Sequence, residues 1–270
     1  MEEKIFEPSF AESEERIESY ADFVAIVKQL RRDCPWDRAQ THESVKHLLI
    51  EEAYEVVEAI DRGDLEELKK ELGDILLHVV FHSVIAEENS SFTLQDVIES
   101  ETEKLVRRHP HVFGDVEATD SDTVLRTWEA TKQKEKKGGS ALDGVPAQLP
   151  ALLRAQRVQE KAAGVGFDFP EASDAWQKVE EEVQELQAAT AEGDDDAIED
   201  ELGDVLFAFV NYARFLNANP ENALRRTLDK FTRRFALIEE ALRARGEALE
   251  DASLEEMDQL WDSVKAEEQA

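Results

Sequence analysis

Apolar residues recur along this chain at intervals of three and four positions, the spacing that places side chains on one face of an α-helix. No stretch keeps the period-two alternation of β-branched residues that a half-buried strand requires. The pattern therefore predicts an all-α protein. It is clearest at Leu48, Leu49, Ala53, Val56, Val57 and Ile60, and again at Leu65, Leu68, Leu72, Ile75, Leu76 and Val79.

Short polar breaks separate the predicted helices. The breaks Arg62-Gly63-Asp64 and Glu192-Gly193-Asp194 are short enough to indicate antiparallel helix hairpins. Ser253 followed by Glu256 forms a capping-box pattern at the start of the last helix. The predicted helices lie at about 13–32, 43–61, 64–88, 93–109, 120–136, 149–163, 171–191, 194–216, 220–245 and 253–267.

A segment near the middle of the chain lacks this periodicity. Residues 136–150, KKGGSALDGVPAQLP, combine basic residues with glycine and proline, a composition typical of a linker. We therefore expect an N-terminal helical domain at 1–137, a linker at 138–150 and a C-terminal helical domain at 151–270.

The two halves share an ordered series of matching residues. The first motifs recur 130 residues later, and a basic motif and a tryptophan also recur in the same order. Chance supplies acidic pairs in an acidic chain, but an ordered set at a nearly fixed separation predicts a tandem duplication. The matches are Glu51-Glu52-x-x-Glu55 with Glu181-Glu182-x-x-Glu185, Gly63-Asp64 with Gly193-Asp194, Glu71-Leu72-Gly73-Asp74 with Glu201-Leu202-Gly203-Asp204, Lys104-x-x-Arg107-Arg108 with Lys230-x-x-Arg233-Arg234, and Trp128 with Trp261.

The repeated acidic motifs can form a metal site. Residues three or four apart share a helix face, and a tight hairpin lets two such helices present their carboxylates to one point. Clustered carboxylates repel one another unless cations lie among them, and hard oxygen ligands suit Mg²⁺ or Mn²⁺. The second-half set is Glu182, Glu185, Glu201 and Asp204, and the first-half set is Glu52, Glu55, Glu71 and Asp74.

A solvated helix face is the competing interpretation of these glutamates, since glutamate is usually exposed. Two observations favour the metal site. Glu71 and Asp74 flank Leu72 and precede an apolar run, and the quartet recurs in the second half although Tyr54 there becomes Gln184. Asp74, His78 and His82 also have a zinc-compatible spacing, but their second-half counterparts are Asp204, Ala208 and Tyr212. We therefore interpret the histidines as packed or hydrogen-bonded.

Charge and composition narrow the classes of partner. The 270 residues contain 31 Lys and Arg against 63 Asp and Glu, a net charge of −32, which disfavours general binding of nucleic acid or anionic membranes. Cys34 is the single cysteine, so no intramolecular disulfide is expected. The first ten residues lack an apolar h-region, and no apolar run approaches a membrane span. We therefore expect a cytoplasmic protein.

These motifs together resemble the MazG family of all-α nucleoside triphosphate pyrophosphohydrolases. The resemblance extends from about residue 20 to residue 267 and includes CPWDRAQTHES (34–44), RRHPHVFGD (107–115) and GVGFDF (164–169). One departure is Phe169, where that family commonly has tryptophan. The resemblance implies Mg²⁺-dependent cleavage of NTPs and dNTPs between the α and β phosphates, giving a nucleoside monophosphate and pyrophosphate. It also implies a homodimer, Mn²⁺ as a substitute metal, and nucleotide-pool house-cleaning.

The resemblance also implies roles for individual residues. The second-half quartet corresponds to the metal ligands, and the C-terminal half of two-repeat members is the better supported catalytic half. Glu181 corresponds to a further ligand or a general base. The residues implied to contact substrate are Lys178, Lys230, Arg233, Arg234 and Trp261.

Other interpretations of these residues and of the whole chain stay open at this point. Lys230 and Arg234 could form surface ion pairs with Asp229 or Glu239, and Trp261 could be a core anchor. A nucleotide or alarmone sensor without turnover, and a helical scaffold for a basic partner, are the competing functions. The sequence leaves open the preferred base and sugar, the activity of the first half, the general base, the physiological role and any protein partner.

Overall fold

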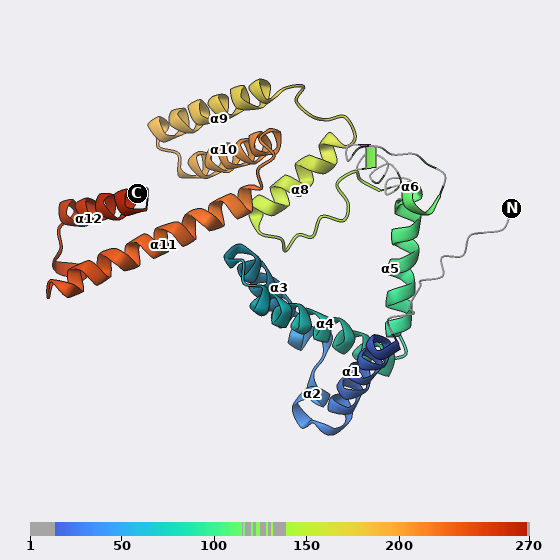
Figure 1. The fold of residues 1–270 in the computed structure, drawn as a ribbon. Helices are drawn as coiled ribbons and strands as arrows, with labels where there is room; N and C mark the ends of the chain where they lie inside the picture. The colour runs from blue at the N-terminus through green and yellow to red at the C-terminus, as the bar shows by residue number, and fades with distance from the viewer. Residues whose placement is uncertain are drawn as a thin grey trace. The chain divides into compact units, whose positions relative to one another are not determined.

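The computed structural model describes residues 14–114, 116, 120, 123–124, 128, 131 and 139–268, with side chains from residue 20 onward. The chain divides into two compact units, residues 1–131 and 132–270 (Figure 1). The finer division at residues 137 and 150 stays a prediction.

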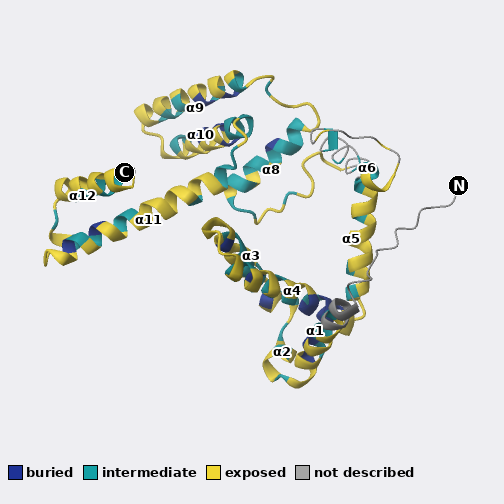
Figure 2. Cartoon of the chain, viewed as in Figure 1, coloured by how far each residue is buried: buried dark blue, intermediate teal, exposed yellow. Residues whose placement is uncertain are grey.

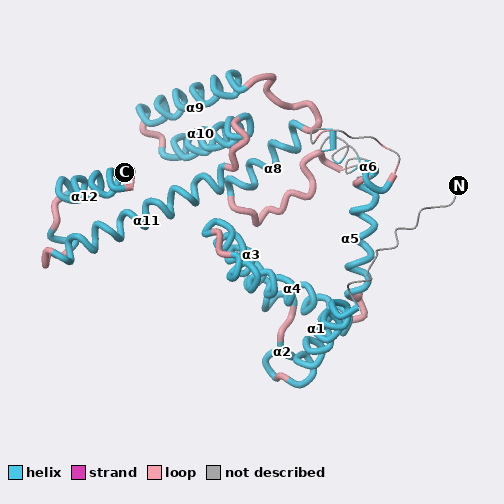
Figure 3. The backbone as a smooth tube through the Cα atoms, in the orientation of Figure 1, coloured by secondary structure: helices cyan, strands magenta, loops and turns pink. Residues whose placement is uncertain are grey.

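The described residues form helices and connecting loops, without any strand (Figure 3). This confirms the all-α class. The first unit contains α1 (Glu14–Asp33), α2 (Pro35–Ala39), α3 (His42–Arg62), α4 (Leu65–Glu88), α5 (Leu94–Arg108) and α6 (Pro110–Phe113). The second contains α8 (Ala151–Ala163), α9 (Ala172–Glu192), α10 (Asp195–Phe215), α11 (Pro220–Ala244), the 3₁₀ turn η1 (Leu249–Asp251) and α12 (Leu254–Glu267).

The long helices agree with the periodicity to within a few residues. The capping box at Ser253 is present, since its side chain accepts from the Glu256 amide. The short elements α2, α6 and η1 were not predicted, because each is at most five residues long and shows no apolar period. Most of the predicted helix at 120–136 lies outside the described residues.

Both predicted hairpins are built in the same way. Gly63 and Gly193 close the first helix of each pair with φ values of 68° and 74°, a left-handed conformation that glycine adopts without steric cost. Asp64 and Asp194 then cap the next helix by accepting two backbone N–H groups each. As a result α3 packs along α4, and α9 packs along α10.

The first unit has its core where α1 and α3 meet the C-terminal half of α4. The buried positions of α4 appear dark blue in Figure 2. The core residues are Val27, Val45, Val80, Phe81, Val84 and Ile85.

Arg31 is a buried charge next to this core, and its partners come from α4 and from α2 with its C-cap residue. Its Nε and Nη2 donate to the Glu88 carboxylate at 3.1 and 2.5 Å. Its Nη1 donates to the carbonyls of Asp37 and Gln40, and the guanidinium lies 5.3 Å from the centre of the Phe81 ring. Each of the three guanidinium nitrogens of Arg31 donates to an acceptor. Arg31, which is on α1, thereby holds α2 against α1 and α4.

The second unit is arranged around the α9–α10 hairpin. Helix α8 packs on α10, α11 contacts α8, and α12 folds back along α11. Its buried apolar residues include Val179, Val205, Val210 and Leu242. Within the described residues, no helix is both long and apolar enough to cross a membrane.

Candidate metal centre

The hairpin of the second unit brings three carboxylates together. Glu182 on α9 and Glu201 and Asp204 on α10 each offer an oxygen atom, and these atoms all lie within 4.8 Å of one another. Glu201 and Asp204 are three apart on one helix and therefore share a face. The tight turn at Gly193 aligns that face with α9.

Glu185 lies beside this trio. Burial is the main cause that raises the pKa of the Glu185 carboxyl, and the negative charges of Glu182 and Glu201 raise it further. The fourth predicted ligand is therefore in electrostatic contact with the trio, although it is not among the atoms within 4.8 Å of one another.

Lys178 supplies the local positive charge. Its Nζ lies 2.6 Å from Glu182 Oε1 and 2.8 Å from Glu181 Oε1. These contacts, first with Glu181 and then with Glu182, raise the pKa of the Lys178 ammonium. Glu182 is only 6% exposed, so Lys178 is the cation that compensates its burial. Glu181 itself faces solvent.

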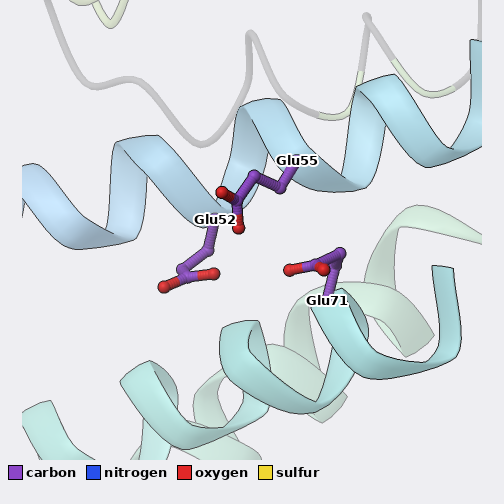
Figure 4. Close-up of side chains that lie close together, drawn as sticks. All are labelled: Glu52, Glu55 and Glu71. Carbon is purple, nitrogen blue, oxygen red and sulfur yellow. The ribbon is translucent and has the colours of Figure 1, made fainter. Parts of the chain in front are cut away.

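The first unit contains a matching trio. Figure 4 shows Glu52 and Glu55 extending from α3 toward Glu71 on α4, and their oxygen atoms also lie within 4.8 Å of one another. Glu71 is 8% exposed. Its burial, followed by hydrogen bonds with Glu67 and Glu55, raises the pKa of the Glu71 carboxyl to about 7. Burial is the main cause that raises the pKa of the Glu52 carboxyl, and the negative charge of Asp74, the remaining residue of the set, raises it further.

The two trios differ in their countercharge. Leu48 occupies the position in α3 that Lys178 occupies in α9. Among the described residues, no ion pair reaches Glu52, Glu55 or Glu71. The first trio therefore has no basic side chain paired with it in the described part of the chain, whereas the second is paired with the Lys178 ammonium group.

The second trio fits a hard divalent cation. All of its donors are carboxylate oxygens, the ligand type that Mg²⁺ and Mn²⁺ prefer. Glu201 Oε2 is buried and has no hydrogen-bond partner. A buried carboxylate oxygen without a partner is costly, and a cation bound among the three residues would satisfy it.

Apart from Lys178, the predicted substrate cations lie on α11. Arg233 and Arg234 both donate to Glu268, at distances between 2.6 and 2.9 Å. These bonds, led by Arg234, lower the pKa of Glu268 to about 2. The Arg234 guanidinium also lies 5.4 Å from the centre of the Trp261 ring. Glu268 is therefore the acidic partner, in place of the Asp229 and Glu239 considered from the sequence.

Lys230 is on the same helix as these arginines. It forms neither an ion pair nor a hydrogen bond within the described part of the chain. No hydrogen bond or ion pair between described residues joins Lys230, Arg233, Arg234 or Trp261 to the carboxylates of α9 and α10.

The basic group is also repeated. Arg108 lies 5.3 Å from the centre of the Trp128 ring in the first unit, as Arg234 does relative to Trp261. Lys104 forms an ion pair with Glu101. The duplication therefore preserves a spatial contact that sequence spacing alone could not establish.

Sequence reasoning missed several contacts that need tertiary structure. Glu268 carried no signal, since it is one of many terminal acidic residues. His82 is hydrogen-bonded, as predicted for the histidines, and its partner across 2.8 Å is Nδ1 of His42. Such pairings join residues far apart in the chain, and no local period reveals them.

Comparison with known proteins adds independent information. The model of the MazG nucleotide pyrophosphohydrolase domain matches twice, at residues 40–113 and 172–236. A Thermotoga maritima protein named nucleoside triphosphate pyrophosphohydrolase/pyrophosphatase MazG is 45% identical over 250 residues, covering 91% of this chain and 95% of that protein. A nucleoside triphosphate pyrophosphohydrolase from Escherichia coli K12 is 42% identical over 253 residues, covering 91% of this chain and 96% of that protein. The Bacillus subtilis protein YabN is 46% identical over 266 residues, or 97% of this chain and 54% of YabN.

Proposed function

The chain belongs to the MazG nucleotide pyrophosphohydrolase family, and on that premise we propose that it hydrolyses nucleoside triphosphates between the α and β phosphates. The products are a nucleoside monophosphate and pyrophosphate. We further propose Mg²⁺ as the working metal with Mn²⁺ as a substitute, a cytoplasmic location, and house-cleaning of the nucleotide pool as the physiological task.

The observation that supports this proposal most directly is the carboxylate trio with its unsatisfied oxygen. Glu182, Glu201 and Asp204 converge from two helices, and Glu185 lies alongside. These four residues would hold the divalent ion. When bound, such an ion polarises the phosphate under attack and lowers the pKa of an attacking water.

We propose that the basic residues bind the phosphate oxygens of the triphosphate. Lys178 places a permanent ammonium group against Glu182, where it can contact a phosphate oxygen while neutralising the ligand. Arg233 and Arg234 can grip phosphate oxygens in pairs. A triphosphate must first displace the Glu268 carboxylate from these two side chains, so Glu268 competes with the substrate for Arg233 and Arg234.

Three further roles complete the proposal. Lys230 is unpaired among the described residues and supplies another cation. Trp261, stacked with Arg234, would contact the base or ribose. Glu181 is either an additional ligand or the general base, and its exposed position on α9 is compatible with both.

We also propose a homodimer. Exposed apolar side chains run along α4 and recur along α10 at the same positions of the repeat. A face of this kind is costly to leave in water, and a second copy of the chain can cover it. On α4 this face is formed by Leu72, Leu76 and Val79, and on α10 the corresponding face is formed by Leu202, Leu206 and Phe209.

The competing function is a sensor that binds nucleotides without turnover. Incubation of the full-length protein with each common NTP and Mg²⁺, followed by separation of the products, distinguishes the two. We expect equal amounts of nucleoside monophosphate and pyrophosphate, none in excess chelator, recovery with Mn²⁺ and poor recovery with Ca²⁺. Ca²⁺ prefers longer bonds and looser geometry, which misplaces the reacting groups. Binding without any products would favour the sensor.

A further inference from the structure

Three histidines lie together in the first unit, where the first turn of α3 meets α4. His42 is the first residue of α3, and His78 and His82 are one helical turn apart on α4. The rings of His42 and His82 are stacked, with centres 5.1 Å apart and planes within 4° of parallel. The ring centres of His78 and His82 are 6.1 Å apart. These three residues form one histidine cluster, which shares no member with the carboxylate trio of the same unit.

One hydrogen bond accounts for only part of the histidine cluster. His42 Nδ1 and His82 Nδ1 are 2.8 Å apart and bonded to each other. In contrast, His78 Nδ1 and His82 Nε2 are buried and have no hydrogen-bond partner, and His78 as a whole is only 8% exposed. A buried polar atom without a partner is costly. The interpretation of the histidines as packed or hydrogen-bonded therefore leaves two ring nitrogens unexplained.

The hydrogen bond indicates which of these nitrogens carry lone pairs. A neutral imidazole has one N–H group and one acceptor nitrogen. If His82 Nδ1 donates to His42 Nδ1, then His82 Nε2 is an acceptor, whereas the reverse arrangement buries an N–H group without a partner. Buried donors are left unpaired more rarely than buried acceptors, so the first arrangement is favoured. By the same reasoning His78 Nδ1 also carries a lone pair.

Burial keeps both histidines of α4 in the neutral form. It is the main cause that lowers the pKa of His78 and of His82. The charge of Asp74 opposes this effect at His78, and the rings of His42 and His78 add to it at His82. Neutral imidazole is the form that binds metal ions, so the cluster offers two lone pairs at neutral pH.

The spacing of the two α4 histidines suits a shared metal ion. Residues four apart share a helix face. With Zn–N bonds of about 2.0–2.1 Å, two imidazoles bound to one tetrahedral ion have ring centres about 5 Å apart. The observed 6.1 Å requires only a small rotation of the side chains. Imidazole nitrogen suits borderline ions such as Zn²⁺ and Co²⁺, whereas Mg²⁺ prefers oxygen ligands.

His42 supplies the outer contact that such a site needs. A histidine that binds a metal usually donates its other ring N–H to an acceptor, which fixes its tautomer and orientation. The bond from His82 Nδ1 to His42 Nδ1 has this role. It also connects the site on α4 to the first turn of α3.

The duplication shows that the fold does not require these histidines. At the repeat separation of 130, the three positions of the histidine cluster correspond to Ala172, Ala208 and Tyr212. The second unit nevertheless forms the same helix hairpin and keeps the carboxylate motifs. The three histidines are therefore a feature of the first unit alone.

From these observations we propose that the first unit binds one borderline transition-metal ion, Zn²⁺ or Co²⁺, through His78 Nδ1 and His82 Nε2. His42 is the positioning residue that orients His82, and water completes the coordination. The site differs in ligand chemistry from both carboxylate trios, and it does not depend on the proposed hydrolysis of nucleoside triphosphates.

The test measures Zn²⁺ binding to the full-length protein by calorimetry, in a large excess of Mg²⁺ so that the carboxylates are occupied. His78→Leu and His82→Tyr each remove a ligand, and His42→Ala removes the outer contact. Two controls locate the ion. His47→Gln changes an exposed histidine of α3, and Glu55→Gln changes the carboxylate trio of the same unit. The visible spectrum of the Co²⁺ complex is a second readout, because nitrogen ligation in a four- or five-coordinate site gives a stronger absorption than oxygen ligation in an octahedral one.

We expect wild type to bind one equivalent of Zn²⁺ that both His78→Leu and His82→Tyr lose, together with the Co²⁺ absorption. His42→Ala should weaken this binding by about tenfold or more, the usual cost of a lost outer partner. His47→Gln and Glu55→Gln should bind as wild type does. Circular dichroism establishes folding, and His78→Leu decides the question if His82→Tyr misfolds, because a leucine at this buried position keeps the packing.

Three results would overturn the inference. One is a wild-type protein that binds no Zn²⁺ in excess Mg²⁺. Another is an equivalent of Zn²⁺ that persists in His78→Leu and His82→Tyr. The third is loss of that equivalent in Glu55→Gln with retention in the histidine variants, which would assign the ion to the carboxylates. None of these results depends on release of pyrophosphate, so the proposed function and this inference fail independently.

Discussion

Lys178 Nζ lies 2.6 Å from Glu182 Oε1, and this ion pair has no counterpart in the first half, where Leu48 takes the place of the lysine. The lysine is partly exposed and the glutamate is buried. Without a metal, the pair therefore compensates one carboxylate of the trio. Lys178 is thus a stabilising residue of the metal-free protein as well as a proposed substrate contact.

We predict that Lys178→Met lowers the free energy of unfolding by about 1 kcal/mol in chelator, because a buried carboxylate loses its partner while solvent screens part of the effect. Urea unfolding measures this loss. Mg²⁺ should reduce the difference, since the ion would replace the missing charge. Lys69→Met, which removes an exposed pair with Glu66, is the control and should change stability by less than about 0.5 kcal/mol. Equal losses in both variants would contradict the prediction.

The second prediction concerns which half carries the activity. Glu185→Gln and Asp204→Asn each remove one negative charge at almost constant volume, and we expect each to reduce turnover by roughly a hundredfold or more. Glu55→Gln and Asp74→Asn make the matched changes in the first half and should retain most activity. Steady-state release of pyrophosphate is the measurement.

The comparison is interpretable when all four variants keep the helical circular dichroism and the assembly state of wild type. The first-half variants should also gain thermal stability, because the carboxylates of the first trio lack a cation and repel one another. Full activity in Glu185→Gln together with its loss in Glu55→Gln would reverse the assignment.

A third prediction follows from the pairing of Glu88 with buried Arg31. The hydrogen bond from Arg31 is the main cause that lowers the pKa of Glu88 below its ordinary value of 4.5. A lowered folded-state pKa contributes stability that is present above the unfolded-state pKa and is lost as the pH falls through the folded-state value. Glu88→Gln should therefore unfold more easily than wild type at neutral pH, by about 1 kcal/mol.

That deficit should shrink as the pH falls below about 4.5, because wild type then loses the same charge. Thermal melts of both proteins across the acidic range measure it. Glu87→Gln, which removes the more exposed pair with Lys28, provides the control with a smaller deficit. A deficit for Glu88→Gln that stays constant into strong acid would show that the charge of Glu88 is not its cause.

The fourth prediction tests the dimer. Leu206→Asp places a charge in the exposed apolar face of α10 and should convert a dimer into a monomer at micromolar concentration, as measured by light scattering. Leu254→Asp changes a still more exposed apolar residue outside that face and should leave the assembly unchanged. A wild-type protein that is a stable monomer under these conditions would contradict the proposal.

Much of the secondary structure could be predicted because it is encoded locally. The helices follow apolar periods, and the hairpins follow from Gly63, Gly193 and the capping aspartates that come next. The short helix α2 could not be predicted, because its position depends on Arg31, whose acceptors lie in other segments. A single helical turn has too few residues for a period.

Only the locally encoded part of the candidate site could be predicted. The spacing of the carboxylates along the sequence identified both sets, and the structure places three residues of each set together. The partners of Arg234 were not predictable, because Glu268 lies 34 residues away, immediately after α12.

The left-handed glycine turn at Gly193 also affects how the protein folds. It joins two helices that are consecutive in the chain, so the carboxylates from Glu182 to Asp204 come together through contacts of short sequence separation. Contacts between residues close in sequence form early and rapidly, because closing a short loop costs little conformational entropy. The hairpin can therefore assemble its ligands before α11 and α12 are in place, and a divalent ion present during synthesis could bind to a nascent chain that still lacks its basic residues.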